Sequence, residues 1–226
     1  MGENMKDNIF KSSKSEKRAL KLLDEKVENI LSIGISTGGS AEVNFARKCP
    51  KAEIVATTVD EKGLEFTNEK LKAFEVGKRI VTKLEDVSKK MPYKDNTFDF
   101  VYARLILHYL TKQQLEDALS EIFRVLKPNG KFFVVARNNK EWELTKPEFI
   151  ISYDEETNIT TYYEQWAYKI IRKRQFLSEE QLNELLNRHN FKILSCKSYR
   201  EYLYTDYERT IKSNKPNFLT ELVAVK

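Results

Sequence analysis

The chain has 226 residues and a formal net charge of +5, and 41% of its residues are hydrophobic. Its 13 Phe, 11 Tyr and 2 Trp supply enough large apolar side chains for a core, which excludes a wholly disordered chain. No apolar run approaches the ~18–20 residues of a membrane-spanning helix, and the N-terminal residues lack the apolar stretch of a secretory signal. Cys49 and Cys196 are too few for a disulfide framework or a four-ligand zinc site. We therefore expect a cytoplasmic protein without a membrane span or a metal site.

The first half of the sequence alternates between strand-like and helix-like patterns. After a loose leader over residues 1–14, a short helix is expected over residues 15–26. The later patterns predict strands at residues 29–35, 53–59, 80–84 and 98–103, and helices at residues 40–48 and 62–76. Strands that alternate with helices at this spacing indicate a parallel sheet covered on both faces.

The second half begins with a clear amphipathic helix. Thr111 and Gln114 have the spacing of a capping box at its start. The apolar stripe of this helix consists of Leu115, Ala118, Leu119, Ile122 and Leu126. Turn-forming residues at 128–130 end the helix and lead into a strand predicted over residues 131–136.

Residues 137–176 interrupt this alternation. They are rich in aromatic and acidic residues without a sustained helical stripe, so we expect an insertion or cap. Order resumes at Ser178, which begins another capped helix. Residues 192–202 and 219–225 then form a terminal pair of strands joined by a polar loop.

The strongest local signal for a ligand is a glycine-rich turn between the first strand and the helix after it. Gly34 allows a sharp turn, and Gly38 and Gly39 let a ligand approach the backbone with no Cβ in the way. The free N–H groups of the following helix point at the same place. A tight turn without a ligand is the alternative, because a glycine turn alone is a weak motif.

A second signal is Asp60, which stands at the end of the following strand. A carboxylate at that position can accept hydrogen bonds from both ribose hydroxyls of a nucleoside lying across the strand ends. It can also cap the next helix, and the two roles are compatible. Together with the glycine turn, Asp60 favours a nucleoside cofactor.

Three further stretches indicate which cofactor this is. Residues 84–101, LEDVSKKMPYKDNTFDFV, resemble the D-x(4)-LPF-x-D-x-x-FD-x-V stretch of class I S-adenosylmethionine-dependent methyltransferases. Residues 121–131, EIFRVLKPNGK, resemble the E-x-x-RVLKPGG-x segment of that family, and residues 107–110, LHYL, are similar to its LHHL. The resemblance covers about residues 28–136 and is closest to the small-molecule group that contains the ubiquinone/menaquinone enzymes.

The resemblance implies an α/β fold, a doubly wound, Rossmann-like seven-stranded sheet whose last strand runs antiparallel. Helices would cover both faces, and a small cap would be inserted. It also implies a single methyltransferase domain over residues 1–226. The expected parts are an N-terminal leader and helix (1–27), a cofactor-binding core (28–136), a cap (137–176), and a C-terminal helix and strand pair (177–226).

The resemblance also implies roles for individual residues toward S-adenosylmethionine. Gly34, Ser36 and Gly38 would line the methionine half, and Asp60 with Glu61 would hold the ribose. Asp86 and the Val87 backbone would meet the adenine edge, and Ala103 and Arg104 would close the site after the fourth strand. Two positions depart from the family pattern. The family usually has an acid where Ser32 stands, which would contact the cofactor's ammonium group, and a glycine where Ser36 stands.

His108 is the candidate catalytic residue, since it follows the fourth strand near the expected acceptor and could serve as a general base. A packed or helix-capping imidazole is its alternative role. His189 continues the stripe of the last helix, so we expect it in the core or at the helix end. Aromatic residues of the expected cap could wall an acceptor pocket or pack the cap itself; they are Tyr153, Tyr162, Tyr163 and Trp166.

We therefore expect a methyltransferase that modifies an O, N or C nucleophile of a small molecule. A non-catalytic nucleoside-binding module of the same fold is an alternative, motivated by the missing acid at Ser32. Methylation of RNA or protein is another, motivated by the basic cluster in residues 169–174, which also suits a solvated helix face. The degenerate glycine fingerprint of residues 34–39 leaves a nicotinamide-dependent oxidoreductase as a third. The sequence names neither the acceptor nor the oligomeric state.

Overall fold

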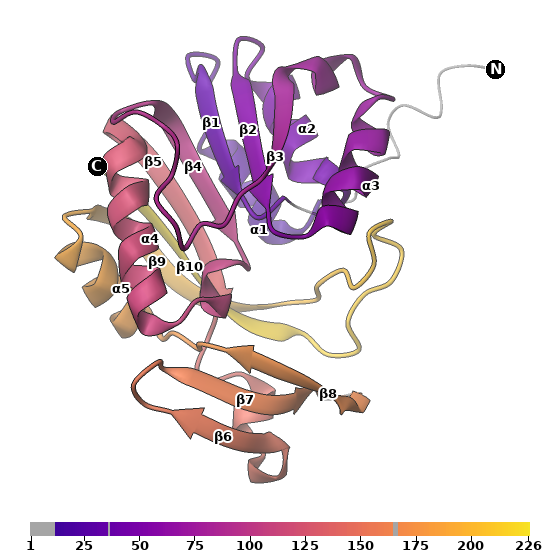
Figure 1. The fold of residues 1–226 in the computed structure, drawn as a ribbon, viewed down its shortest axis with the longest axis vertical. Helices are drawn as coiled ribbons and strands as arrows, with labels where there is room; N and C mark the ends of the chain where they lie inside the picture. The colour runs from indigo at the N-terminus through magenta and orange to yellow at the C-terminus, as the bar shows by residue number, and fades with distance from the viewer. Residues whose placement is uncertain (1–11, 36, 165–166) are drawn as a thin grey trace.

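A seven-stranded sheet forms the centre of the computed structural model, which describes residues 12–35, 37–164 and 167–226 (Figure 1). The strand order is β3-β2-β1-β4-β5-β10-β9, and β10 runs antiparallel to both of its neighbours. The strands are β1 (Asn29–Ile33), β2 (Glu53–Thr58), β3 (Ile80–Leu84), β4 (Phe98–Arg104), β5 (Leu126–Arg137), β9 (Lys192–Glu201) and β10 (Asn217–Val225). The predicted doubly wound sheet with an antiparallel last strand is confirmed.

Helices cover both faces of this sheet, as predicted. One face carries α1 (Lys14–Lys21), α2 (Ser40–Lys48) and α3 (Glu61–Leu71), and the other carries α4 (Lys112–Val125) and α5 (Glu179–Arg188). Short 3-10 helices lie in the connections: η1 (Thr37–Gly39), η2 (Glu75–Arg79), η3 (Leu107–Tyr109), η4 (Trp142–Thr145) and η5 (Pro147–Phe149). None of the helices in the described part of the chain is long and apolar enough to cross a membrane.

Side-chain alternation along the strands builds two hydrophobic cores, one on each face of the sheet. In β1, Ile30 packs into the core beside α2, while Leu31 packs into the core beside α4 and α5. Because both faces are buried, the central strands are nearly continuous apolar runs in the sequence. The stripe predicted for α4 lies in the second core, and its capping box is present.

Three element ends differ from the prediction by five residues. The helix expected over residues 15–26 is α1, which ends at Lys21. The helix expected over residues 62–76 ends at Leu71, where Phe74 donates its amide to the Leu71 carbonyl and the chain tightens into η2. The strand expected from residue 131 begins at Leu126, because the turn residues pair with the C-terminus: the Asn129 amide donates to Lys226 at 3.1 Å. Asn129 accommodates the turn with φ of 63°.

Residues 137–176, expected as an insertion, contain a separate three-stranded antiparallel sheet. Its strands are β6 (Ile150–Asp154), β7 (Ile159–Glu164) and β8 (Ala167–Arg174), in the order β6-β7-β8. Figure 1 shows it beyond one end of the large sheet, with the β9–β10 connection (residues 202–216) running past the same end. The basic residues 169–174, interpreted as one possible solvated helix face, therefore belong to a strand, where successive side chains point to opposite faces.

Candidate active site

The carboxyl ends of four strands of the large sheet open into one cavity of about 450 Å³. Gly34 follows β1, Thr58 ends β2, Arg104 ends β4 and Arg137 ends β5, and all four line the cavity. The three-stranded sheet and the β9–β10 connection supply the remaining walls. In open α/β sheets this edge is where ligands bind, so the sheet topology itself places a candidate site here.

The glycine turn adopts backbone conformations that favour glycine at three positions. Gly34, Gly38 and Gly39 have φ of 75°, 66° and 71°. A Cβ added at Gly34 would lie 2.8 Å from Cγ1 of Ile106, and one added at Gly38 would lie 3.1 Å from the Tyr207 carbonyl oxygen. The turn therefore needs glycine for both conformation and space. Ser36, expected in the same turn, lies outside the described residues.

A carboxylate that the sequence analysis missed stands behind this turn. Ser32 is fully buried in β1, and its hydroxyl donates to Oε1 of Glu42 at 2.6 Å. Glu42 lies in the first turn of α2 and is also fully buried. A buried carboxylate from ten residues later therefore lies beside Ser32, although neither residue lines the large cavity.

Asp60 lies exposed between β2 and α3, with a partner that the sequence did not reveal. It occupies the N-cap position of α3 without a side-chain capping hydrogen bond. Instead, its Oδ2 accepts the hydroxyl of Tyr207 from the β9–β10 connection at 2.6 Å. This bond, with the nearby Gly63 amide, lowers the pKa of Asp60, so the carboxylate is ionised at neutral pH. Glu61 is exposed at the first position of α3.

The two residues expected at the adenine edge lie apart from the large cavity. Asp86 and Val87 line a smaller cavity of about 100 Å³, together with Glu85 and Met91. Asp86 is exposed and accepts the Ser88 amide at 2.9 Å. The structure therefore groups the expected cofactor residues along the strand ends without bringing all of them to one cavity.

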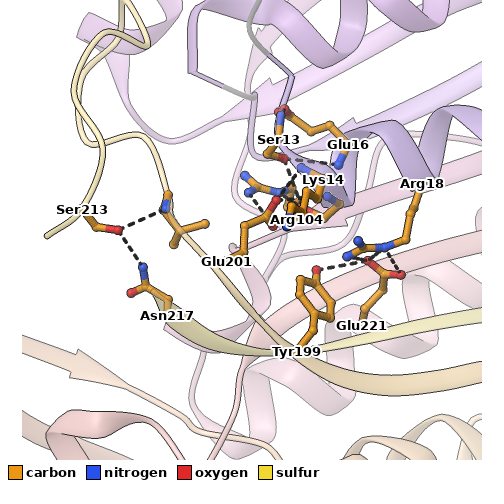
Figure 2. A network of polar contacts seen from close by, with 12 residues as sticks. Ser13, Lys14, Glu16, Arg18, Arg104, Tyr199, Glu201, Ser213, Asn217 and Glu221 are labelled. Carbon is orange, nitrogen blue, oxygen red and sulfur yellow. Dashed lines mark hydrogen bonds and ion pairs between the residues drawn. The ribbon is translucent and has the colours of Figure 1, made fainter. Parts of the chain in front are cut away.

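The last two expected cofactor residues differ in environment. Ala103 is fully buried in the core beside α4 and lines neither cavity. Arg104 lines the large cavity but is bound from behind, where its Nε donates to the Ser15 hydroxyl at 2.7 Å and its guanidinium lies 3.6 Å from Glu201 (Figure 2). Arg104 therefore connects β4 to the start of α1 and to β9.

The same network joins α1 to the β9–β10 connection. The buried Glu16 carboxylate accepts hydrogen bonds from both terminal nitrogens of Arg209, at 2.6 and 2.7 Å. Burial alone would raise the pKa of Glu16, but Arg209 and Arg104 lower it to about 2. Nearby, Arg18 forms a bidentate pair with Glu221 of β10 (Figure 2). These contacts hold the segments that border the cavity on this side.

His108, the candidate base, is buried in η3 and lines the large cavity. Its ring lies 4.5 Å from that of Tyr109, and its Nδ1 has no hydrogen-bond partner. Burial lowers the pKa of His108 well below its usual value, and Arg174 and Arg137 lower it further. The imidazole is therefore neutral at physiological pH. His189 instead ends α5, as expected, and its Nε2 lies 2.6 Å from Glu116.

Comparisons with known proteins agree with this geometry. A family model described as a methyltransferase domain matches residues 31–134. The chain is 37% identical over 83 residues to a sterol 4-C-methyltransferase of Caenorhabditis elegans, covering 37% of this chain and 24% of that protein. It is 31% identical over 115 residues to a ubiquinone/menaquinone biosynthesis C-methyltransferase of Cupriavidus taiwanensis, covering 50% and 44%. The matches thus span less than half the length of these relatives.

A solved structure extends the likeness over nearly the whole fold. An S-adenosylmethionine-dependent methyltransferase of Methanosarcina mazei superposes with a TM-score of 0.70 at 18% identity, covering 91% of this chain and 95% of that one. Residues 31–134 therefore match a methyltransferase domain, and the fold around them is the fold of a solved S-adenosylmethionine-dependent methyltransferase. The glycine turn and strand ends of this segment are the parts described above, while the far wall of the large cavity lies beyond the matched residues.

That far wall of the large cavity is charged, and the sequence analysis named only its two β8 arginines, as members of the basic cluster in residues 169–174. Arg137 ends β5, and Glu141 and Glu143 follow it; Arg172 and Arg174 come from β8. Burial raises the pKa of Glu141 to about 7, against the opposing effect of Arg137 and with the help of Glu143. The only sequence signal was the spacing of Arg172 and Arg174, which places both on one face of a strand.

The cap aromatics contribute less to this wall than expected. Tyr162 is fully buried behind the wall and accepts a hydrogen bond from Arg174 at 2.6 Å. Tyr153 is exposed and does not line the cavity. Tyr163 is half-buried outside the lining, and Trp166 lies outside the described residues. Tyr109 of η3 lines the cavity instead.

Proposed function

We propose that this chain transfers the methyl group of S-adenosylmethionine to an O, N or C nucleophile of a small molecule. One observation carries the proposal: a single cavity of about 450 Å³ extends from the glycine turn at Gly34 and Ile35 to the charged wall on β8. Such a cavity has room for a cofactor end and an acceptor in contact, which direct transfer requires. A cytoplasmic location belongs to the same proposal, and the two free thiols, Cys49 and Cys196, are compatible with it.

The residues present fit the cofactor. In the proposed arrangement the Asp60 carboxylate accepts the two ribose hydroxyls, with Glu61 beside it. The glycine turn at Gly34, Ser36 and Gly38 borders the methionine half, and Asp86 with the Val87 backbone meets the adenine edge. Arg104 closes the site at the end of β4, whereas Ala103, which was expected to help, is buried in the core beside α4. The exposed, ionised carboxylate and the turn without Cβ atoms support this placement.

Bound S-adenosylmethionine supplies a methyl group on a positively charged sulfur. The contributions of this chain are to hold the acceptor in line with that methyl group and to exclude water. Where the nucleophile carries a proton, we propose that His108 accepts it, since its neutral imidazole lines the cavity. Arg174 and Arg137 make the imidazolium costly, so an anionic group in the cavity would favour this proton transfer.

The first experiment is calorimetry with S-adenosylmethionine, S-adenosylhomocysteine and NADH. Micromolar binding of both sulfur nucleosides, with none of NADH, is the expected result. Binding of neither sulfur nucleoside would overturn the proposal, and binding of NADH alone would favour the oxidoreductase alternative.

A non-catalytic module of the same fold is the second candidate. It is motivated by the missing acid at Ser32, whose hydroxyl instead donates to the buried Glu42 carboxylate. Methylation of RNA is weakened by the strand geometry of β8: Lys173 is exposed, whereas Arg174 is buried against the cavity. An RNA-binding constant that falls steeply with salt would support the RNA alternative.

A further inference from the structure

The charged wall of the large cavity contains more positive charge than its ion pairs neutralise. Four of its arginines have carboxylate partners: Arg104 with Glu201, Arg137 with Glu141, Arg172 with Glu164, and Arg209 with Glu16. Arg174 and Lys215 line the same cavity and have no carboxylate partner within residues 12–35, 37–164 and 167–226. Arg174 donates to the hydroxyls of Tyr162 and Tyr109, and Lys215 lies 3.5 Å from the centre of the Trp142 ring.

Unsatisfied polar atoms concentrate at the same place. Among the described residues, the buried side-chain atoms without a hydrogen-bond partner are Tyr102 Oη, His108 Nδ1, Glu143 Oε2 and Arg174 Nε. All four residues line the large cavity. Arg174 is only 6% exposed, so its unpaired Nε–H cannot be attributed to a solvated surface position. Buried polar groups without a protein partner point to a ligand or water that satisfies them.

Resting on the proposed function, we propose that the methyl acceptor is a small molecule that carries one carboxylate group, bound by Arg174. Its two terminal nitrogens each donate one hydrogen bond to a tyrosine hydroxyl, which fixes the guanidinium in the cavity wall while its charge has no carboxylate partner among the described residues. A charge-assisted hydrogen bond from an immobilised guanidinium to a carboxylate is among the strongest that proteins make.

The charge balance favours a monoanion. Above the pKa of Glu141, about 7, the Arg137–Glu141 pair carries no net charge. The two cavity-lining cations that lack a carboxylate partner among the described residues, Arg174 and Lys215, are then opposed by one carboxylate without a cation, that of Glu143. A ligand with a single negative charge neutralises the difference. The unpaired Oε2 of Glu143 then accepts a hydroxyl or N–H group of the same molecule, which suits a polar acceptor rather than a hydrocarbon.

The test compares acids with their uncharged amides in the presence of saturating S-adenosylhomocysteine. The probes are benzoate, 4-hydroxybenzoate and phenylacetate, each beside its primary amide, with phenyl phosphate as a dianion. Dissociation constants are measured by ligand-observed NMR or calorimetry. We expect at least one acid to bind tenfold or more tightly than its amide. Equal binding of acid and amide, no binding of any acid, or tighter binding of phenyl phosphate than of every acid would overturn the proposal.

Variants on one strand assign the effect to Arg174. Arg174→Gln removes the charge and should abolish the preference for acids without changing the affinity for S-adenosylhomocysteine. Lys173→Gln is the matched control, because it removes one positive charge from the neighbouring exposed position of β8. An acid preference that survives in Arg174→Gln would overturn the assignment. Arg174→Lys is the second variant if Arg174→Gln folds poorly, and it should lose most of the preference because lysine lacks the fixed guanidinium.

The outcomes separate this inference from the proposed function. If S-adenosylhomocysteine binds and the acids show no preference over amides, only the carboxylate inference fails. If the acids bind through Arg174 and neither sulfur nucleoside binds, the methyl-transfer proposal fails and the anion site stands.

Discussion

Tyr207→Phe should increase the affinity of the chain for its cofactor. The Tyr207 hydroxyl donates to Oδ2 of Asp60 at 2.6 Å, so it occupies a carboxylate oxygen that the ribose hydroxyls are proposed to use. Each binding event then breaks this bond. Phenylalanine keeps the ring, which packs 5.2 Å from that of Phe66, and removes only the hydroxyl.

The size of the effect follows from the exposure of the two partners. A hydrogen bond to a charged group contributes about 1.5–3 kcal/mol when it is sheltered. Asp60 is exposed and Tyr207 is 45% exposed, so solvent competes for both and we take about 1 kcal/mol. Removing this competition should tighten binding about fivefold.

The assay is calorimetry with S-adenosylhomocysteine on four proteins: wild type, Tyr207→Phe, Asp60→Ala and the double variant. Asp60→Ala should weaken binding about tenfold, equivalent to ~1.4 kcal/mol. In the Asp60→Ala background, Tyr207→Phe should have no further effect, because its partner is gone. Tyr153→Phe is the matched control, since that tyrosine is 59% exposed on the three-stranded sheet. Unchanged or weaker binding in Tyr207→Phe would refute the competition, and unchanged binding in Asp60→Ala would refute the ribose role.

Three further predictions concern buried ionisable groups. Ser32→Asp, which restores the family's acid, should destabilise the fold by about 3 kcal/mol because a second buried carboxylate would face that of Glu42; adding Glu42→Gln should recover most of the loss in urea unfolding. Glu16→Gln should cost about 3 kcal/mol at pH 7, because the buried Arg209 guanidinium loses the negative charge of its ion-pair partner. The folded-state pKa of Glu16, about 2, lies below its usual 4.5, so this stabilisation is complete above pH 4.5 and is lost as the pH falls toward 2. Urea unfolding of wild type and Glu16→Gln should therefore converge over that range. NMR should find that the His108 ring titrates well below the usual 6.5, and a titration midpoint near 6.5 would contradict the burial argument.

The central sheet could be predicted from sequence because its order depends on local patterns. The strands β1, β2, β3 and β4 are short apolar runs between helices with clear stripes, and both capping boxes predicted for α4 and α5 are present. The three-stranded sheet could not be predicted in the same way. All residues of β6 are exposed, so no alternation of apolar and polar side chains marked it as a strand.

In the candidate site, too, the residues in local motifs could be predicted and the contacts between distant segments could not. Gly34 and Asp60 stand in local motifs, and the structure places both at the expected strand ends. Tyr207 contacts Asp60 across 147 positions of sequence, and Glu42 reaches Ser32 from a different element. Neither pairing has a sequence pattern, because each depends on how separate segments pack rather than on periodicity. Arg174 was noticed only as one member of a basic cluster, and its role depends on which face of β8 it occupies.

The limit of the family match explains why the acceptor has to be inferred from this chain alone. The match ends at residue 134, and the charged wall begins at Arg137 and continues through Arg174 to the β9–β10 connection. The family match therefore covers the residues proposed to bind the cofactor, while the residues proposed to face the acceptor lie outside it. Two of the relatives are a sterol methyltransferase and a ubiquinone/menaquinone biosynthesis methyltransferase. A wall with a guanidinium that lacks a carboxylate partner among the described residues, and with a buried carboxylate, disfavours apolar molecules such as sterols, because they would offer neither group an ionic or hydrogen-bonding partner. The same cofactor-binding core can thus serve a polar acceptor through a different cap, and the acid–amide comparison measures that difference directly.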